Sequence, residues 1–193
     1  MNTGYCCQLT VLHACAHSRY HSCVQKLVYL SLGSNLGNRV ANLETAIERL
    51  RELGSITAIS SFYETEPVDY VQQPWFLNCA VALRTDAMPR QLLTRTLAVE
   101  QAMGRRRGVP KGPRVIDIDI LLFGTSMIDT AILTIPHPAL HERRFVLEPL
   151  AEIAPEARHP VFKKTIRELF AALPHDGAKV RRIRKTPAEE QPQ

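Results

Sequence analysis

The sequence predicts an α+β fold, a ferredoxin-like βαββαβ plait with an antiparallel sheet and C-terminal additions. Three observations lead to this class. From Leu27 onward, segments with strand periodicity and segments with helical periodicity follow one another in that order. Hydrophobic residues make up 45% of the 193 residues and charged residues 22%, which is typical of a globular protein. A chain of this length suits one domain with short appendages.

The first strand and the first helix are predicted at the start of the domain. Val28, Leu30 and Leu32 alternate with their neighbours, which is the period of a strand with one buried face. After a short polar turn, apolar residues recur at helical spacing over 40–50, and Gly54 ends the helix.

The next four elements complete the βαββαβ order. A second strand is predicted at 56–64 and a third at 76–83, where apolar residues again alternate. A helix is predicted over 89–104 because its apolar residues recur at helical spacing, and Pro89 is tolerated in the first helical turn. The fourth strand is predicted at 114–123. Two helices on one face of such a sheet would leave the other face free.

The C-terminal part is predicted to add short elements and a tail. An apolar segment covers 128–135, and two short helices are predicted near 139–148 and 165–172. We therefore expect the domain to extend over 27–173, followed by a basic, flexible tail at 174–193.

Residues 1–26 are expected to be a disordered extension, or to result from a start site placed too far upstream. Four of the five cysteines lie in the first 23 residues, and their spacing with neighbouring histidines matches no closed zinc site. Only Cys79 remains in the predicted domain, so we expect a reducing, cytoplasmic setting. No apolar run approaches the ~18 to 20 residues of a membrane-spanning helix, so we expect no membrane association.

The net charge of +5 comes from two short basic segments. Residues 104–114 and 179–185 carry five basic side chains each and no acid, whereas the rest of the chain has 14 basic and 19 acidic residues. A uniformly basic nucleic-acid-binding surface is therefore not expected. An RNA-recognition domain has the same βαββαβ order and is the competing class. However, no RNP1-like segment is present, and carboxylates on the open face would repel a nucleic acid, so we expect no nucleic-acid partner.

Asp117 and Asp119 lie two residues apart among the isoleucines of the fourth predicted strand. Alternation places both carboxylates on one face, with Cα atoms about 6.5 Å apart. Two anions this close need a cation to neutralise them. One interpretation is a pair of solvent-facing ion pairs with Arg105 or Arg114. The other, which we favour, is a site for two divalent cations such as Mg²⁺, an arrangement used in phosphoryl transfer.

The arginine-rich loop directly precedes this acidic strand. Arg105, Arg106 and Arg107 follow a predicted helix, and glycines and prolines interrupt the loop. Guanidinium groups match phosphate oxygens in a bidentate manner. A solvated basic loop is the alternative interpretation. Beside paired carboxylates, however, the loop indicates a metal–nucleotide complex. A metal-dependent nucleotide transferase is therefore one functional class that fits these two segments.

The usual nucleotide-binding signatures are absent from the sequence, because residues 33–39 lack the Lys-Ser/Thr of a P-loop. Phe76 and Asn78 fall on the open face of the third strand. There an aromatic ring can stack on a flat heterocycle and an amide can bond its edge, although a core position is an equal alternative for Phe76. For His137, between two prolines, a structural role and a phosphate contact both remain open.

Five segments between Leu27 and Leu173 resemble the 6-hydroxymethyl-7,8-dihydropterin pyrophosphokinase family. They read LSLGSNLGNR, SSFYETEPV, QPWFLNCAV, MGRRRGVPKGPRVIDIDILLFG and IPHPALHERRFVLEPL, of which the fourth is long and highly specific. Lys111 stands where many family members carry Trp. The resemblance implies transfer of diphosphate from ATP to the hydroxymethyl group of the pterin in folate biosynthesis, with AMP leaving.

The resemblance also implies roles for individual residues. The ligands of two Mg²⁺ ions would be Asp117 and Asp119. The pterin pocket would be formed by Gly33, Thr65, Val68, Phe76, Asn78 and Phe145. The contacts to ATP would come from Glu100, Arg105, Ile120, Thr134, His137 and Arg143. The cations that close over the phosphates and act in transfer would be Arg105, Arg107 and Arg114. The implied partners are ATP and the pterin, with Mg²⁺ as cofactor, and we expect a monomer.

Overall fold

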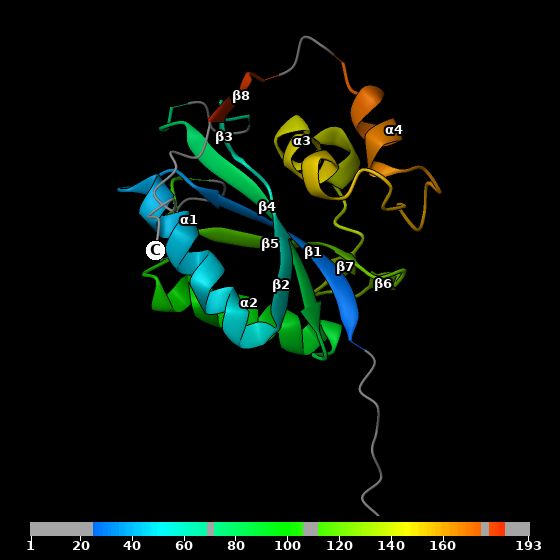
Figure 1. Cartoon of the computed structure of the whole chain (residues 1–193). Coiled ribbons are helices and arrows are strands. Elements are labelled where there is room, and N and C mark those ends of the chain that lie inside the picture. The colour runs from blue at the N-terminus through cyan, green and yellow to red at the C-terminus, as the bar shows by residue number, and fades with distance from the viewer. Residues whose placement is uncertain (1–24, 69–71, 106–111, 175–177, 184–193) are drawn as a thin grey trace, which may run out of the picture.

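The computed structural model of the chain describes residues 25–68, 72–105, 112–174 and 178–183. Its main sheet has six strands in the order β5-β1-β4-β3-β8, with β2 also paired to β4, and all pairs are antiparallel (Figure 1). The strands of this sheet are β1 (Lys26–Ser34), β2 (Ser55–Ile59), β3 (Phe62–Thr65), β4 (Phe76–Thr85), β5 (Asp117–Phe123) and β8 (Val180–Ile183). The helices are α1 (Arg39–Leu50), α2 (Pro89–Ala102), α3 (Arg144–Ile153) and α4 (Ile166–Ala171). The predicted α+β class with an antiparallel sheet is confirmed.

One face of the sheet packs on α1 and α2. Leu30 of β1 lies in this helix-side core with Leu43 of α1 and Leu92 of α2, and all three are fully buried. The predicted polar turn supplies the N-cap of α1, because the side chain of Asn38 accepts a hydrogen bond from the backbone N–H of Ala41 (3.1 Å). The alternating apolar residues of the sequence therefore face these two helices.

The sequence predicts that the other face of the sheet is free. This prediction is wrong in part, because α3 and α4 cover some of that face. Leu147 of α3 and Leu169 of α4 pack in a second core with Ala80 of β4 and Leu122 of β5. Figure 1 shows α3 and α4 on the side of the sheet opposite α1 and α2. The functional residues of this face lie at the remaining end, where β1 ends and β4 and β5 begin.

The predicted second strand is two strands, β2 and β3. The partner of Ile59 on β4 is Val81, whereas the partner of Tyr63 is Asn78, so one extra residue lies on this side of the ladder. At the break, the hydroxyl of Ser60 accepts a hydrogen bond from a backbone N–H of β4 (2.9 Å). This is the geometry of a β-bulge, which strand periodicity alone does not locate.

Other boundaries also differ from the prediction. The fourth predicted strand starts at Asp117, and the helix predicted near 139–148 is α3, which starts at Arg144 after a 3₁₀ turn at Leu140–Glu142. The apolar segment 128–135 folds back as a two-stranded ribbon of β6 (Ile128–Asp129) and β7 (Thr134–Ile135).

The predicted flexible tail contains a strand of the main sheet. β8 pairs with the whole of β3, and two of its arginines form ion pairs. Arg181 contacts Glu64 (2.6 Å) and Arg182 contacts Glu152 (2.9 Å). The basic residues that suggest a solvated tail therefore hold this strand in place, and the folded part extends beyond the predicted boundary at residue 173.

The predicted N-terminal extension, residues 1–26, lies outside the described residues except for its last two, and Lys26 is the first residue of β1. Among the described residues, none of the helices has the length and hydrophobicity that a membrane-spanning helix requires.

Candidate functional site

Three strands meet at the uncovered end of the sheet. Gly33 of β1 lies between Asn78 of β4 and Asp117 of β5, and Ser31 lies opposite Asp119. A Cβ atom at Gly33 would lie 2.6 Å from Oδ1 of Asn78, which is closer than real contacts allow. Glycine at this position therefore lets the amide lie directly against the strand.

A cavity of about 270 Å³ opens at this end of the sheet. Its walls combine aromatic, amide, carboxylate and guanidinium groups. The predicted site residues that line it are Gly33, Thr65, Val68, Phe76, Asn78, Arg105, Arg114, Asp117, Asp119, His137, Arg143 and Phe145. All six residues predicted for the pterin thus surround the same cavity as both predicted metal ligands.

The amide and aromatic groups of the wall are held by their neighbours. Asn78 donates from Nδ2 to the hydroxyl of Thr65 (2.6 Å), so its orientation is defined. Phe76 lies 5.1 Å from the guanidinium of Arg114 and belongs to neither core, so the core interpretation for Phe76 is wrong. These groups offer a flat ligand an aromatic face and a hydrogen-bonding edge.

The two carboxylates of β5 have different surroundings. Asp117 forms ion pairs with Arg105 (2.5 Å) and Arg114 (3.0 Å), as the ion-pair interpretation predicts. Within the described residues, no hydrogen bond or ion pair reaches Asp119. Burial and the neighbouring Asp117 carboxylate raise the pKa of Asp119 to about 6. A carboxylate in this position is stabilised by a cation, and its hard oxygen atoms fit Mg²⁺.

Glu100 orients one of the cavity arginines from behind. It is 3% exposed, and its Oε1 accepts hydrogen bonds from the backbone N–H of Ile118 (2.7 Å) and from Nη1 of Arg105. Burial raises the pKa of Glu100 to about 7. The Arg105 guanidinium thus bridges Glu100 of α2 and Asp117 of β5.

His137 reaches the cavity from the segment that follows β7. Its Nδ1 accepts a hydrogen bond from the backbone N–H of Ala139 (3.2 Å), so in the neutral ring the proton lies on Nε2. Burial, followed by the nearby charge of Arg143, lowers the pKa of His137. A neutral histidine that keeps one N–H donor can contact a phosphate oxygen.

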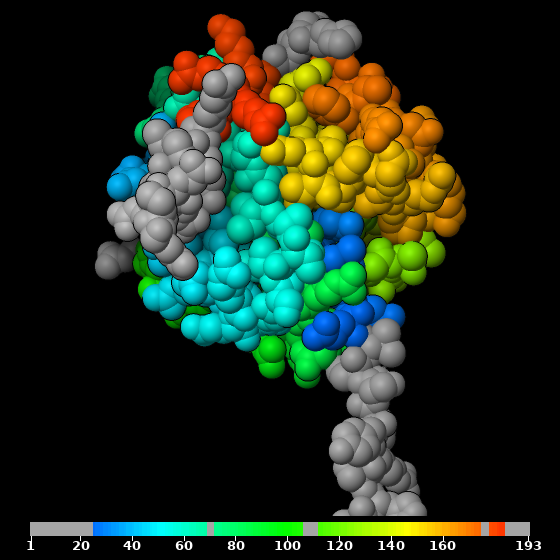
Figure 2. All heavy atoms as spheres, in the orientation of Figure 1, coloured from blue at the N-terminus to red at the C-terminus, as the bar shows by residue number. Residues whose placement is uncertain are grey.

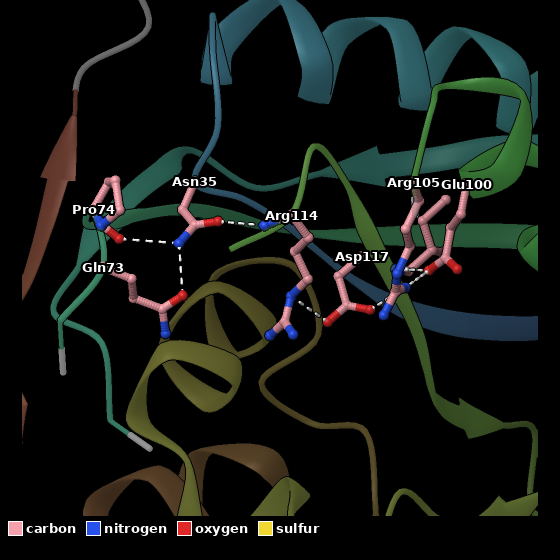
Figure 3. A network of polar contacts seen from close by, with 8 residues as sticks. Asn35, Gln73, Pro74, Glu100, Arg105, Arg114 and Asp117 are labelled. Carbon is pink, nitrogen blue, oxygen red and sulfur yellow. Dashed lines mark hydrogen bonds and ion pairs between the residues drawn. The ribbon is translucent and has the colours of Figure 1, made fainter. Parts of the chain in front are cut away.

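A chain of polar contacts connects the walls of the cavity (Figure 3). The side chain of Asn35 donates to Gln73 (3.0 Å) and to the carbonyl of Pro74 (3.1 Å). The same side chain accepts from the backbone N–H of Arg114 (2.7 Å), and the backbone N–H of Asn35 donates to the Arg114 carbonyl (3.1 Å). Asn35 therefore joins the segment before β4 to the end of the arginine-rich loop.

Among the residues that the structure describes, three of the predicted ones do not line this cavity. Ile120 is 5% exposed and packs in the helix-side core, so its side chain faces away. Glu100 lies behind Arg105, and Thr134 lines a neighbouring hollow that shares His137 with the cavity. Arg107 and Lys111 lie outside the described residues.

Five residues of the site are missing from the prediction. Ser31 has the same strand parity as Gly33, so alternation alone would find it. The others lie in irregular segments, where no period indicates which side chains turn toward the cavity. They are Asn35, Glu66, Pro67 and Gln73.

Comparison with known proteins is consistent with this site. Residues 29–155 match the family model described as 7,8-dihydro-6-hydroxymethylpterin-pyrophosphokinase (HPPK). The chain is 46% identical over 132 residues to the 2-amino-4-hydroxy-6-hydroxymethyldihydropteridine pyrophosphokinase of Bacillus subtilis, covering 67% of this chain and 79% of that one. The Aquifex aeolicus protein of the same name is 42% identical over 141 residues, covering 73% and 88%.

Longer proteins also match. The folic acid synthesis protein fol1 of Schizosaccharomyces pombe is 39% identical over 164 residues, which are 84% of this chain but 22% of that protein. The solved structure of wild-type Plasmodium falciparum HPPK-DHPS with pterin and p-hydroxybenzoate has the same fold. Its TM-score is 0.62 at 21% identity, covering 76% of this chain and 41% of the other. The chain therefore belongs to the 7,8-dihydro-6-hydroxymethylpterin-pyrophosphokinase family and is a pyrophosphokinase of folate biosynthesis.

Proposed function

We propose that the chain transfers diphosphate from ATP to the hydroxymethyl group of 6-hydroxymethyl-7,8-dihydropterin in a Mg²⁺-dependent reaction. The hydroxyl oxygen of the pterin attacks the β-phosphorus in line. The bond from the β-phosphorus to the oxygen that bridges it to the α-phosphorus breaks, and AMP leaves with that oxygen. The hydroxyl proton is released to solvent. The observation that supports this best is the single cavity in which Asp117 and Asp119 lie beside Phe76 and Asn78.

Asp117 and Asp119 are the proposed ligands of two Mg²⁺ ions. Bound there, the ions would neutralise phosphate charge and polarise the group that is transferred. The raised pKa of Asp119 supports this assignment, as does the absence of a hydrogen bond or close ion pair to its carboxylate among the described residues. Asp117 already lies between Arg105 and Arg114. The position proposed for the phosphates is therefore next to a carboxylate that could bind Mg²⁺ and to guanidinium groups that could bind phosphate oxygens.

The pterin is proposed to occupy the part of the cavity that Asn78 and Thr65 define. The hydrogen-bonded pair presents donors and acceptors to the edge of a flat heterocycle, and Phe76 and Phe145 offer aromatic faces. Gly33 provides space beside the amide, because any larger residue would displace it.

The arginines and His137 are proposed to hold the ATP phosphates. Arg105, Arg114 and Arg143 line the cavity with His137, and Arg107 would join them from the arginine-rich loop. Their contribution is charge neutralisation and positioning, which are the main requirements of phosphoryl transfer. Glu100 would act through Arg105, which it orients.

A direct assay tests the proposal. The protein is mixed with ATP, Mg²⁺ and 6-hydroxymethyl-7,8-dihydropterin, and nucleotides are separated by chromatography. We expect AMP in equal amount to the pterin diphosphate, no AMP without the pterin, and no AMP after EDTA removes divalent cations. ADP as the product, or AMP formed at the same rate without the pterin, would contradict the proposal.

We also propose that the enzyme acts as a monomer in a reducing, cytoplasmic setting. Among the described residues, Cys79 is a buried free thiol, as is usual for cysteine in a reducing compartment. Sedimentation or size-exclusion chromatography at assay concentrations should give one species near the chain mass of 21.7 kDa.

A further inference from the structure

β8 lies along the outer edge of β3, the strand that leads into the cavity wall (Figure 1). Val180 pairs with Thr65, and the backbone N–H of Glu66 donates to the carbonyl of Lys179 (3.0 Å). Thr65, Glu66 and the two residues that follow all line the cavity. β8 therefore supports β3 up to the point where the chain enters the wall. Figure 2 shows β8 at the molecular surface, close to α3.

Glu64 of β3 lies between two arginines behind this wall. Its Oε1 accepts a hydrogen bond from Arg39 (2.8 Å) and its Oε2 accepts one from Arg181 of β8 (2.6 Å). Glu64 has the same strand parity as Phe62, which packs in the helix-side core, so its carboxylate lies on the face opposite the cavity. Arg39 also donates to the carbonyl of Trp75 (2.8 Å).

These contacts reach both strands of the wall. Thr65 follows Glu64 in the chain, Phe76 follows Trp75, and Thr65 and Phe76 are paired across β3 and β4. The Thr65–Phe76 pair is therefore fixed from behind through the residue that precedes each member.

We propose that Glu64 is a positioning residue for pterin binding, and that its ion pairs with Arg39 and Arg181 hold the Thr65–Phe76 wall in its binding geometry. This inference rests on the proposed function of the cavity. Glu64 does not line the cavity, so it acts only through its neighbours.

The burial of the ion pair between Glu64 and Arg39 supports this role. The side chain of Glu64 is 15% exposed and that of Arg39 is 30% exposed, whereas that of Arg181 is 74% exposed. Exposed ion pairs contribute little because solvent and salt screen them, so Arg39 is the stronger partner and Arg181 the weaker one. The hydrogen bond from Arg39 is the main cause that holds the pKa of Glu64 below its usual value, and Arg181 adds to it.

The cavity-side face of the same strands offers a matched control. Arg182 neighbours Arg181 but donates to Glu152 of α3 (2.9 Å). Glu152 also accepts hydrogen bonds from the hydroxyls of Tyr63 (2.8 Å) and Ser61 (2.9 Å). None of the described partners of Glu152 lines the cavity. Loss of the Glu152 carboxylate should therefore weaken the same strands without moving the pterin wall.

Steady-state kinetics of Glu64→Gln and Glu152→Gln test the inference, because each change removes one charge and keeps the side-chain size. In Glu64→Gln we expect the KM for the pterin to rise about fivefold, with kcat and the KM for ATP within about twofold of wild type. In Glu152→Gln we expect an unchanged KM for the pterin and a lower Tm. Arg181→Ala should raise the KM for the pterin by a smaller factor, and Arg181→Lys should restore it.

Hydrogen–deuterium exchange provides a readout that needs no turnover. The amide of Glu66 should exchange faster in Glu64→Gln than in wild type, and at the wild-type rate in Glu152→Gln. An unchanged KM for the pterin in folded Glu64→Gln, or an equal rise in both variants, would overturn the inference. If Glu64→Gln fails to fold, the same criteria apply to Arg181→Ala against Arg182→Ala. Wild-type protein without pterin-dependent AMP formation would contradict the proposed function alone.

Discussion

The two faces of the main sheet use the same strands for different purposes. In β5, Ile118 is 5% exposed and packs in the helix-side core, whereas its neighbour Asp119 lines the cavity with a pKa raised to about 6. In β4, Leu77 packs in the core and the next residue, Asn78, lines the cavity. Because side chains alternate along a strand, one residue packs in the core and the next one lines the cavity. A single substitution can therefore lower either the stability of the fold or the activity of the cavity and largely leave the other unchanged.

The largest expected effect is on the cavity face. Asp119→Asn should lower turnover by about a thousandfold, because a carboxylate that holds a metal ion supplies several kcal/mol of charge stabilisation in the transition state. The Tm should stay the same or rise, since the change removes a buried charge. AMP formation and differential scanning fluorimetry measure the two effects. Glu48→Gln, an exposed acid of α1, is the control and should leave both unchanged. Near-normal turnover of Asp119→Asn would break the metal assignment.

The neighbouring residue should show the opposite behaviour. Ile118→Ala should lower the free energy of unfolding by about 3 kcal/mol, because it leaves a cavity in a close-packed core. The fraction that remains folded should keep kcat within about threefold of wild type. Chemical denaturation and kinetics at low temperature measure this, with Ile118→Val as a milder control expected to cost about 1 kcal/mol. A loss of turnover as large as that of Asp119→Asn in fully folded protein would contradict the division between the faces.

A third change sharpens the comparison inside the cavity. Gly33→Ala would place a Cβ atom 2.6 Å from Oδ1 of Asn78, so the amide must move away from its bond to Thr65. We expect the KM for the pterin to rise about tenfold, which corresponds to about 1.4 kcal/mol. In a double-mutant cycle, Gly33→Ala should add little once Asn78→Ala is present. Additive effects would show that Gly33 acts independently of the amide.

The smallest expected effect is on the pH dependence of stability, through Glu64 on the face opposite the cavity. The pKa of Glu64 is lowered, first by its hydrogen bond from Arg39, so its contribution to stability is fully present above the ordinary glutamate pKa. That contribution is lost as the pH falls through the lowered pKa of the folded state. The difference in Tm between wild type and Glu64→Gln should therefore shrink as the pH falls below the ordinary glutamate pKa of about 4.3. A difference that stays constant or widens in acid would contradict this account.

Much of the site can be predicted because its residues lie in regular strands. Asn78, Asp117 and Asp119 follow the alternation of β4 and β5, and the structure places all three around one cavity. Residues in irregular segments, such as Glu66 and Gln73, have no period to indicate their direction. The break between β2 and β3 is missed for a related reason, since Ser60 and Ser61 at the break are polar and give no apolar period from which to read the register.

Sequence was sufficient for the family, the order of the elements and the face on which Asn78, Asp117 and Asp119 lie, because these depend on neighbours a few positions apart. The tertiary structure was needed for the contacts between distant segments. Arg181 and Glu64, which form an ion pair, are separated by 117 residues in the sequence. The packing of α3 on β4 and the hydrogen bond between Asn35 and Arg114 also join segments that are remote in the sequence. Such contacts form only when the folded chain brings unsatisfied backbone groups and opposite charges together, and they leave no period in the local sequence.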